Sequence, residues 1–413
     1  MNKKIMALAV TSVFAAPAFA QAPGGVTLYG RANLGLDSYS AVGATTAGND
    51  FKSRMRVFDS GSRLGVRGVE DLGSGLRAVF QIESGVNMDN GTAQGQGNQA
   101  NTSSGFLGSR PSWVGLEGGF GRLTFGRTDI WWGNGTINQT AANYINTDIP
   151  LLTGSVGRVN AGIARQSNVV QYTSPTINGF GTTLSYQPNS ENAAGNVNAN
   201  ASIAGVTARW ASGPINTQVD WSTVRAASPS NTVNATRATN KNLKGSVGFT
   251  YAPGGQISFL AMQLRNSDTT TKAGFSTQGD DLKQSTMAVS WEHMFGKIQA
   301  LAGAGSAGSV SGCTATSGAV AGVSGSTCND TKTAAYMMGL RYIASKRTSI
   351  YVTYNQIRNG ANQNMDYTGG SYTSANDATN VTTGGVNSTT GGVPIASVGV
   401  DPRVIGLGFQ HNF

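Results

Sequence analysis

The last ten residues of the chain, VIGLGFQHNF (residues 404–413), alternate between two kinds of side chain. One set of alternating positions is largely apolar and aromatic, and the other carries mostly small or polar residues; the first set is Ile405, Leu407, Phe409, His411 and Phe413. Successive side chains of a β-strand point to opposite faces, so this segment is predicted to be a strand with one apolar face. A strand of this kind at a chain end needs a neighbour along each edge.

The same alternation recurs along the whole chain after Gln21. Sixteen alternating segments can be read, separated by clusters of Gly, Asn, Ser, Thr and Asp. The connections between them are short and long in turn, as in outer-membrane barrels, which combine an even strand number with short periplasmic turns and long external loops. The prediction is an all-β, 16-stranded antiparallel transmembrane β-barrel.

The two faces of the predicted strands differ in chemistry. In the first segment Val26, Leu28 and Leu34 share one face, whereas Arg31 and Asp37 share the other. A soluble secreted sandwich would also alternate, but its polar face would carry Lys and Glu freely; here Thr, Ser, Asn, Gly and Arg dominate. This favours a barrel whose apolar face meets lipid, with the last strand closing against the first. Phe409 then faces lipid, and Phe413 lies near the periplasmic interface.

The first twenty residues resemble a secretory signal peptide. Lys3 and Lys4 precede an apolar stretch, and Ala18-Phe19-Ala20 forms a small-residue cleavage pattern. We therefore expect residues 1–20 to be removed and residues 21–413 to form one barrel domain. No later apolar run has the length of about 20 residues that a membrane helix needs.

Cys313 and Cys328 are the only cysteines, and both lie in a segment rich in Gly, Ser and Thr. An exported chain with two cysteines in one loop is expected to join them in a disulfide. A pair of free thiols is the alternative. Two cysteines without a nearby histidine do not predict a metal site.

The inward face of the predicted barrel is rich in positive charge. The whole chain carries a net charge of +9, and removing Lys3 and Lys4 with the signal peptide leaves +7. The basic residues assigned to the lumen are Arg31, Arg63, Arg67, Arg77, Arg110, Arg122, Arg165, Arg209, Arg341, Lys244 and Lys297, against Asp37, Glu83, Asp220 and Glu292. Rings of Arg and Lys favour anions, so a moderate anion preference is expected.

Other kinds of chemistry are not indicated. His293 and His411 are the only histidines and form no hydrolase constellation, so no enzyme, cofactor or metal is expected. The basic residues are spread along alternating strands and are not clustered with aromatic residues, which argues against a nucleic-acid partner.

Four stretches of the chain resemble the general porins of Gram-negative bacteria, and in particular the trimeric porins common in Burkholderia-like and Neisseria-like bacteria. They are VTLYGRANLGLD, GSRLGVRGVEDLGSGLRAVFQIESG, SWVGLEGGFGRLTFGR and NVVQYTSPTINGFG. The resemblance extends from the first strand to the terminal Phe413. It implies a 16-stranded barrel, a homotrimer, a third loop folded into the lumen, and passive diffusion of small hydrophilic solutes and ions.

The resemblance also implies a pore constriction made of wall arginines that face acidic residues of the third loop. Matched by motif, the arginines are Arg63, Arg110 and Arg165, with Arg158 as the alternative to Arg165. Pro111 departs from the family pattern, which usually has a polar residue there. The third loop would run from about residue 128 to 158, and its carboxylates are Asp129 and Asp148.

The remaining expectations concern partners and alternatives. A terminal Phe413, with Phe409, resembles the signal read by the machinery that inserts outer-membrane barrels, and lipid and lipopolysaccharide would surround the barrel. A solute-selective porin for an anion such as phosphate or a small carboxylate is the nearest alternative. A surface adhesin or a structural barrel with little conductance is the alternative from another class.

Overall fold

The computed structural model describes residues 25–45, 50–86, 88–89, 107–130, 165–188, 202–225, 239–267, 281–312, 328–363, 365 and 399–413. The predicted signal peptide, Cys313, Asp148 and Arg158 lie outside these residues. The strands are β1 (Gly25–Val42), β2 (Phe51–Asp59), β3 (Arg63–Gly73), β4 (Leu76–Gly85), β5 (Ser112–Gly118), β6 (Gly121–Asp129), β7 (Arg165–Thr173), β8 (Phe180–Gln187), β9 (Ser202–Ser212), β10 (Ile215–Arg225), β11 (Thr239–Ala252), β12 (Gly255–Ser267), β13 (Asp281–Phe295), β14 (Ile298–Ala307), β15 (Thr333–Ile343), β16 (Thr348–Asn359) and β17 (Asp401–Asn412). No helix among the described residues is long and apolar enough to cross a membrane.

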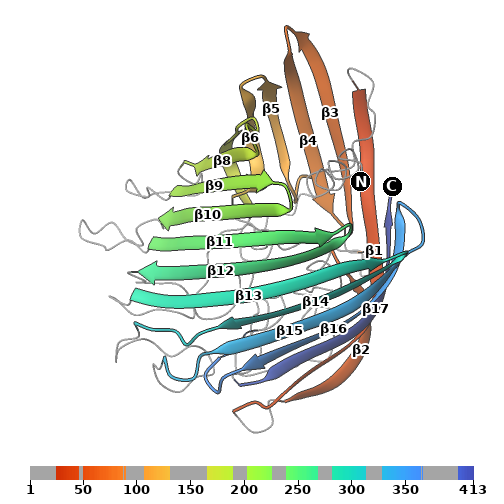
Figure 1. The fold of residues 1–413 in the computed structure, drawn as a ribbon, viewed down its shortest axis with the longest axis vertical. Helices are drawn as coiled ribbons and strands as arrows, with labels where there is room; N and C mark the ends of the chain where they lie inside the picture. The colour runs from red at the N-terminus through yellow and green to blue at the C-terminus, as the bar shows by residue number, and fades with distance from the viewer. Residues whose placement is uncertain are drawn as a thin grey trace.

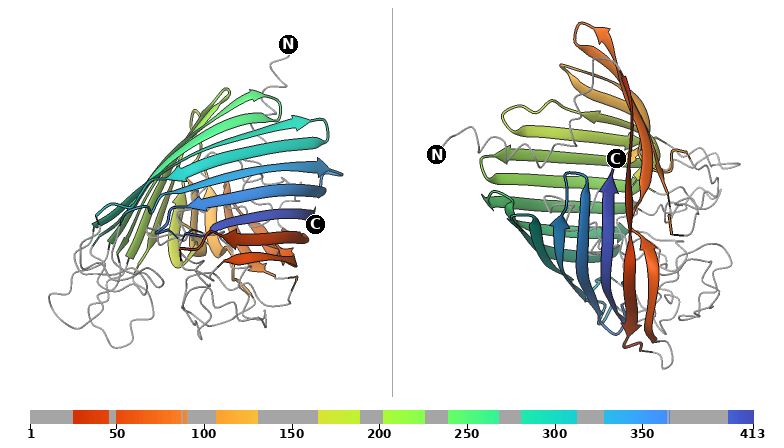
Figure 2. Two further views of the ribbon diagram at one scale, coloured as in Figure 1. Left: turned by 90° about the horizontal axis from the view of Figure 1, so that it is seen from below. Right: turned by 90° about the vertical axis from the view of Figure 1, so that its right-hand side faces the viewer.

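The strands form one closed antiparallel sheet. From β3 to β17 each strand pairs with the next one along the chain, and they follow one another around the wall in Figure 1. β17 pairs with β1, placing Phe409 opposite Leu34, and Figure 2 shows β17 beside β1. The ring is therefore closed by the segment at the very end of the chain. This confirms the predicted barrel and its seam.

Residues 54–69, RMRVFDSGSRLGVRGV, are expected from their alternation to be the second of the sixteen strands, but this strand is interrupted in the middle. The N-terminal half of the long strand β1 pairs with β3, with Arg31 opposite Arg63. Its C-terminal half pairs with β2, with Leu34 opposite Asp59. Between them Gly61 has a positive φ of 73°, a left-handed conformation that breaks the extended chain and is unstrained in glycine. Counting β2 and β3 as halves of one strand reconciles the seventeen strands with the sixteen predicted.

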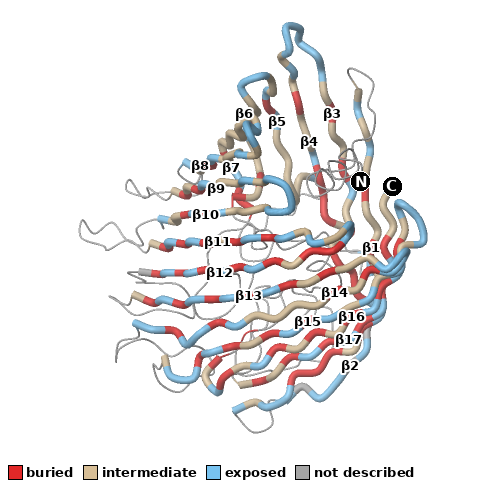
Figure 3. Tube along the Cα trace, in the orientation of Figure 1, coloured by how far each residue is buried: buried red, intermediate tan, exposed pale blue. Residues whose placement is uncertain are grey.

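The barrel is apolar outside and polar inside. Val26 and Leu28 are 70% and 63% exposed on the outer side of β1, whereas Asn33 and Asp37 on the inner side are 0% and 2% exposed. Buried and exposed residues alternate along most strands in Figure 3. A soluble protein shows the opposite arrangement, so the outer side is a surface for lipid.

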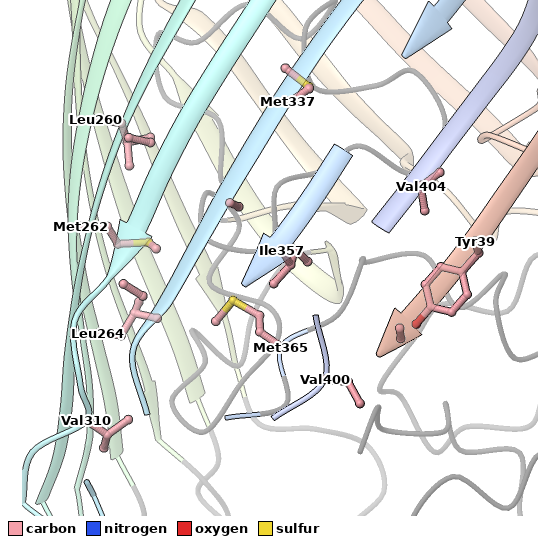
Figure 4. Close-up of a cluster of buried hydrophobic side chains, with 14 of the residues drawn as sticks. Tyr39, Leu260, Met262, Leu264, Val310, Met337, Ile357, Met365, Val400 and Val404 are labelled. Atoms are coloured by element: carbon pink, nitrogen blue, oxygen red, sulfur yellow. The ribbon is translucent and has the colours of Figure 1, made fainter. Parts of the chain in front are cut away.

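One part of the inner wall departs from this pattern. Leu260, Met262 and Leu264 on β12 are buried and share their face with Met337 on β15, while neighbouring Phe259 points outward. Figure 4 shows these side chains together with Ile357, Val404 and Tyr39 from β16, β17 and β1. The alternation of apolar and polar residues in β12 holds from Gln256 to Phe259 and stops at Leu260, so sequence patterning did not indicate this inward apolar patch.

Candidate functional site

Arginines from neighbouring strands gather on the inner wall between β1 and β7. Arg31 and Arg63 stand opposite each other on β1 and β3, Arg110 precedes β5, and Arg165 begins β7. The charge of Arg110 acts on Arg31, Arg63 and Arg165, so the four guanidinium groups are electrostatic neighbours. These four residues are called the arginine cluster below.

Glu83 on β4 connects three residues of this wall. Its Oε1 lies 2.5 Å from Nε of Arg110, and its Oε2 accepts a hydrogen bond from the Tyr29 hydroxyl at 3.0 Å. Nε of Arg63 is 4.0 Å from the same Oε2. Glu83 is buried, so it acts as the counter-charge around which these groups are ordered.

Asp129 pairs with Arg165 on the adjacent strand. The two side chains approach to 2.9 Å, and the backbones are paired across β6 and β7. Asp129 is thus the last residue of β6 and not part of a free loop, because the strand pairing continues past a bulge after Gly126. The expected partnership between a wall arginine and this carboxylate therefore occurs between neighbouring strands.

Arg31 is held by the backbone at the break between β2 and β3. Its guanidinium donates hydrogen bonds to the carbonyl oxygens of Ser60 at 3.0 Å and Gly61 at 2.9 Å. A Cβ at position 61 would lie 2.9 Å from Nη2 of Arg31, so a side chain there would displace the guanidinium, and the positive φ favours glycine. The break in the strand therefore orients a charge of the arginine cluster.

The other predicted lumen residues lie farther along the wall. Arg67 and Arg77 are closer to the short turn between β3 and β4, and Arg77 forms an ion pair with Glu117. Arg209 on β9 donates a hydrogen bond to Gln218 Oε1 at 3.0 Å, and Arg341 lies on β15. The structure thus separates Arg209 and Arg341 from the arginine cluster and brings Arg31 into it.

Sequence reasoning assigned Glu83 to the lumen but did not connect it with Arg110 or Tyr29. Its inward orientation follows from its position in β4, which is a local property. Its partners are Tyr29 on β1, Arg63 on β3 and Arg110 just before β5, and these residues meet only when the strands are assembled into the wall. The sequence signal that could have indicated these ion pairs was a carboxylate on the inward face of a strand that also carries, with its neighbours, several inward arginines.

The terminal residue Phe413 is paired with β1. Its backbone exchanges hydrogen bonds of 3.0 Å and 3.1 Å with Gly30. A Cβ atom on Gly30 would lie 2.3 Å from Cζ of the Phe413 ring, so glycine makes room for the aromatic ring. Phe409 and Phe413 both remain exposed on the outer side, as expected for residues at a lipid boundary.

A closed antiparallel barrel with apolar side chains outside and paired charges inside defines a membrane channel of the porin class. The model of the Gram-negative porin family matches residues 7–362, and the chain belongs to this family. It is an integral β-barrel of the outer membrane, and its family is one of channels.

Proteins similar to this chain include two outer-membrane proteins and one solved porin structure. An outer membrane porin of Bordetella pertussis is 29% identical over 401 residues, covering 87% of this chain and 95% of the other. The major outer membrane protein P.IB of Neisseria gonorrhoeae is 32% identical over 191 residues, about half of each protein at 46% and 49%. An anion-selective porin from Comamonas acidovorans shares the fold, with a TM-score of 0.65 at 18% identity over 94% of this chain and 100% of the other.

Proposed function

We propose that this outer-membrane porin forms a water-filled diffusion channel with a moderate preference for anions, and that the arginine cluster sets this preference. The observation that carries the proposal is the local excess of positive charge: four arginines stand against three carboxylates, Glu83, Asp129 and Asp59, the last of which acts on Arg31. Guanidinium stays charged at any relevant pH, and low-dielectric walls concentrate the field of fixed charges. Anions would therefore be enriched along this wall.

The preference is expected to be moderate. The Debye length is about 8 Å at physiological ionic strength, so a mobile ion a short distance from the wall is partly screened. Three of the four guanidinium groups also lie within 4.0 Å of a carboxylate. The structure of the similar Comamonas protein is described as that of an anion-selective porin, which agrees with this direction.

Further proposals concern the assembly and the loops. We infer a homotrimer from the family, with lipid and lipopolysaccharide around its outer face. The barrel-assembly machinery would recognise the C-terminal strand that ends on Phe409 and Phe413. A constriction loop carrying Asp148, the choice between Arg158 and Arg165, and the Cys313–Cys328 disulfide remain predictions, because each involves residues outside the described part of the chain.

The test is the reversal potential of the reconstituted channel in a salt gradient. The double variant Arg63→Ala with Arg110→Ala removes two charges from the arginine cluster, and its anion preference should fall clearly. The matched control, Arg209→Ala with Arg341→Ala, removes two lumen charges outside the cluster and should change the preference less. Equal effects of the two double variants would contradict the assignment to the cluster, and absence of conductance in planar bilayers would support a structural barrel.

A further inference from the structure

Two arginines on the inner wall lie on aromatic rings. Cζ of Arg67 is 5.3 Å from the centroid of the Tyr29 ring, and Cζ of Arg122 is 5.3 Å from the Trp113 ring. Both distances are within the range of about 6 Å in which a guanidinium is attracted to an aromatic face. Each guanidinium is therefore positioned over an aromatic face.

The two stacks belong to one continuous patch. Arg67 is opposite Gln81, and Gln81 is opposite Trp113, so the three residues form a row across β3, β4 and β5. We call Tyr29, Arg67, Gln81, Trp113 and Arg122 the stacked-arginine patch. Two strand spacings separate Arg67 from Trp113, which corresponds to about 10 Å.

The patch lies between the arginine cluster and the short-turn end of the barrel. Arg67 follows Arg63 by four residues along β3, which is about 13 Å of strand. All five side chains are half-buried, in contrast to the buried Glu83 and Arg165. A solute that has passed the arginine cluster would therefore meet this patch before leaving the channel.

The five side chains of the patch carry two positive charges. The Tyr29 hydroxyl donates a hydrogen bond to Glu83, which is also bound to Arg110, and Glu117, which is opposite Arg122, is paired with Arg77. The amide of Gln81 donates a hydrogen bond to the carbonyl oxygen of Pro111 at 3.2 Å. The patch therefore places two guanidinium groups, each over an aromatic ring, along one wall.

A guanidinium stacked on a ring has a second face and a row of N–H donors. A carboxylate can accept two parallel hydrogen bonds from those donors, and a flat conjugated ring can stack on the second face. A tetrahedral or aliphatic anion can use only the first of these interactions. The geometry is thus better matched to a flat aromatic anion than to a compact inorganic one.

We propose that the stacked-arginine patch is a binding subsite for planar aromatic carboxylates in transit through the channel. The proposal rests on the proposed function, because the solute must first enter an anion-preferring lumen. It adds a class of solute and five residues that recognise it through stacking and charge together.

The test compares benzoate with cyclohexanecarboxylate as blockers of the chloride current through the full-length reconstituted channel. The two probes have the same charge and similar size, but only benzoate has an aromatic face. Benzoate should reach half-block at a concentration about two- to fivefold lower, the ratio expected for one stacking contact. Equal half-blocking concentrations would overturn the proposal.

Two variants locate the effect. Trp113→Leu removes one ring, and Arg122→Lys keeps the charge but loses the flat guanidinium; each should reduce the benzoate advantage. Trp210→Leu changes a tryptophan exposed on the outer side, and Arg209→Lys changes a lumen arginine outside the patch, so both should retain it. If Trp113→Leu does not fold, Arg122→Lys decides alone. A benzoate advantage that persists unchanged in the patch variants would overturn the assignment.

The outcome also separates this proposal from the proposed function. A channel that prefers chloride over potassium but does not distinguish the two carboxylates contradicts the subsite alone. A channel without anion preference contradicts the proposed function, and the subsite with it.

Discussion

Glu83 holds Arg110 by both side chain and backbone. Its carboxylate lies 2.5 Å from Nε of Arg110, and its carbonyl oxygen accepts a hydrogen bond from the Arg110 backbone N–H at 3.0 Å. The arginine that precedes β5 is therefore oriented by a residue of β4. Glu83 thus fixes the direction of one guanidinium and supplies one of the negative charges beside the arginine cluster.

Glu83→Gln is expected to increase the anion preference of the channel. The substitution keeps the size of the side chain but raises the net charge of the wall by one, and it weakens a charge-assisted hydrogen bond of about 1.5–3 kcal/mol. The reversal potential in a salt gradient measures the preference. Glu117→Gln adds the same charge nearer the short turns and should shift the potential less. An unchanged potential in Glu83→Gln would show that Glu83 does not influence permeating ions.

The ion pair between Asp220 and Lys244 is expected to stabilise the wall between β10 and β11. Its atoms are 3.1 Å apart, and the lysine side chain is fully buried. In Asp220→Asn the ammonium group would remain buried without its carboxylate, at a cost of about 3–5 kcal/mol in unfolding free energy. The urea midpoint of the refolded barrel measures this loss.

The exposed pair of Arg265 and Asp281 provides the control for that prediction. Its ends lie on β12 and β13 and are open to solvent, so Asp281→Asn should leave the urea midpoint nearly unchanged. A similar loss in both variants would mean that burial of the first pair does not matter.

Gly30→Val is expected to weaken the seam between β1 and β17. The added side chain would meet the Phe413 ring and also the backbone oxygen of Arg63, 2.8 Å from the new Cβ. Overpacking of this kind costs about 1–3 kcal/mol. The fraction of compact, heat-modifiable barrel on unboiled gels should fall. Gly245→Val is the matched strand control, since a Cβ at Gly245 meets nothing within 4 Å, and it should fold normally.

Phe259→Arg is expected to impair folding into lipid. Phe259 is 58% exposed on the outer side of β12, where it would face hydrocarbon. An arginine at the bilayer midplane costs about 2–4 kcal/mol in a transmembrane barrel. Urea unfolding from lipid vesicles checks the loss, with Phe259→Leu as an apolar control. Equal stability of both variants would place this position outside the hydrocarbon layer.

The sequence alone determined the fold class, the strand pattern and the orientation of most side chains. Alternation with a period of two is a local property of an extended chain, so Val26 could be assigned to the outside and Arg31 to the lumen without a structure. The alternation of short and long connections indicated a barrel, and the apolar face of residues 404–413 indicated the closing strand.

Only the tertiary structure decided which side chains meet. The pairing of Glu83 with Arg110, of Asp129 with Arg165, and of Arg31 with the carbonyl oxygens at Gly61 joins residues from different strands. These contacts depend on strand register, on a bulge and on the break between β2 and β3. The face on which a side chain lies is set by the position of the residue in its own strand. Which two side chains meet is set by the register between two strands, and no single segment encodes that register.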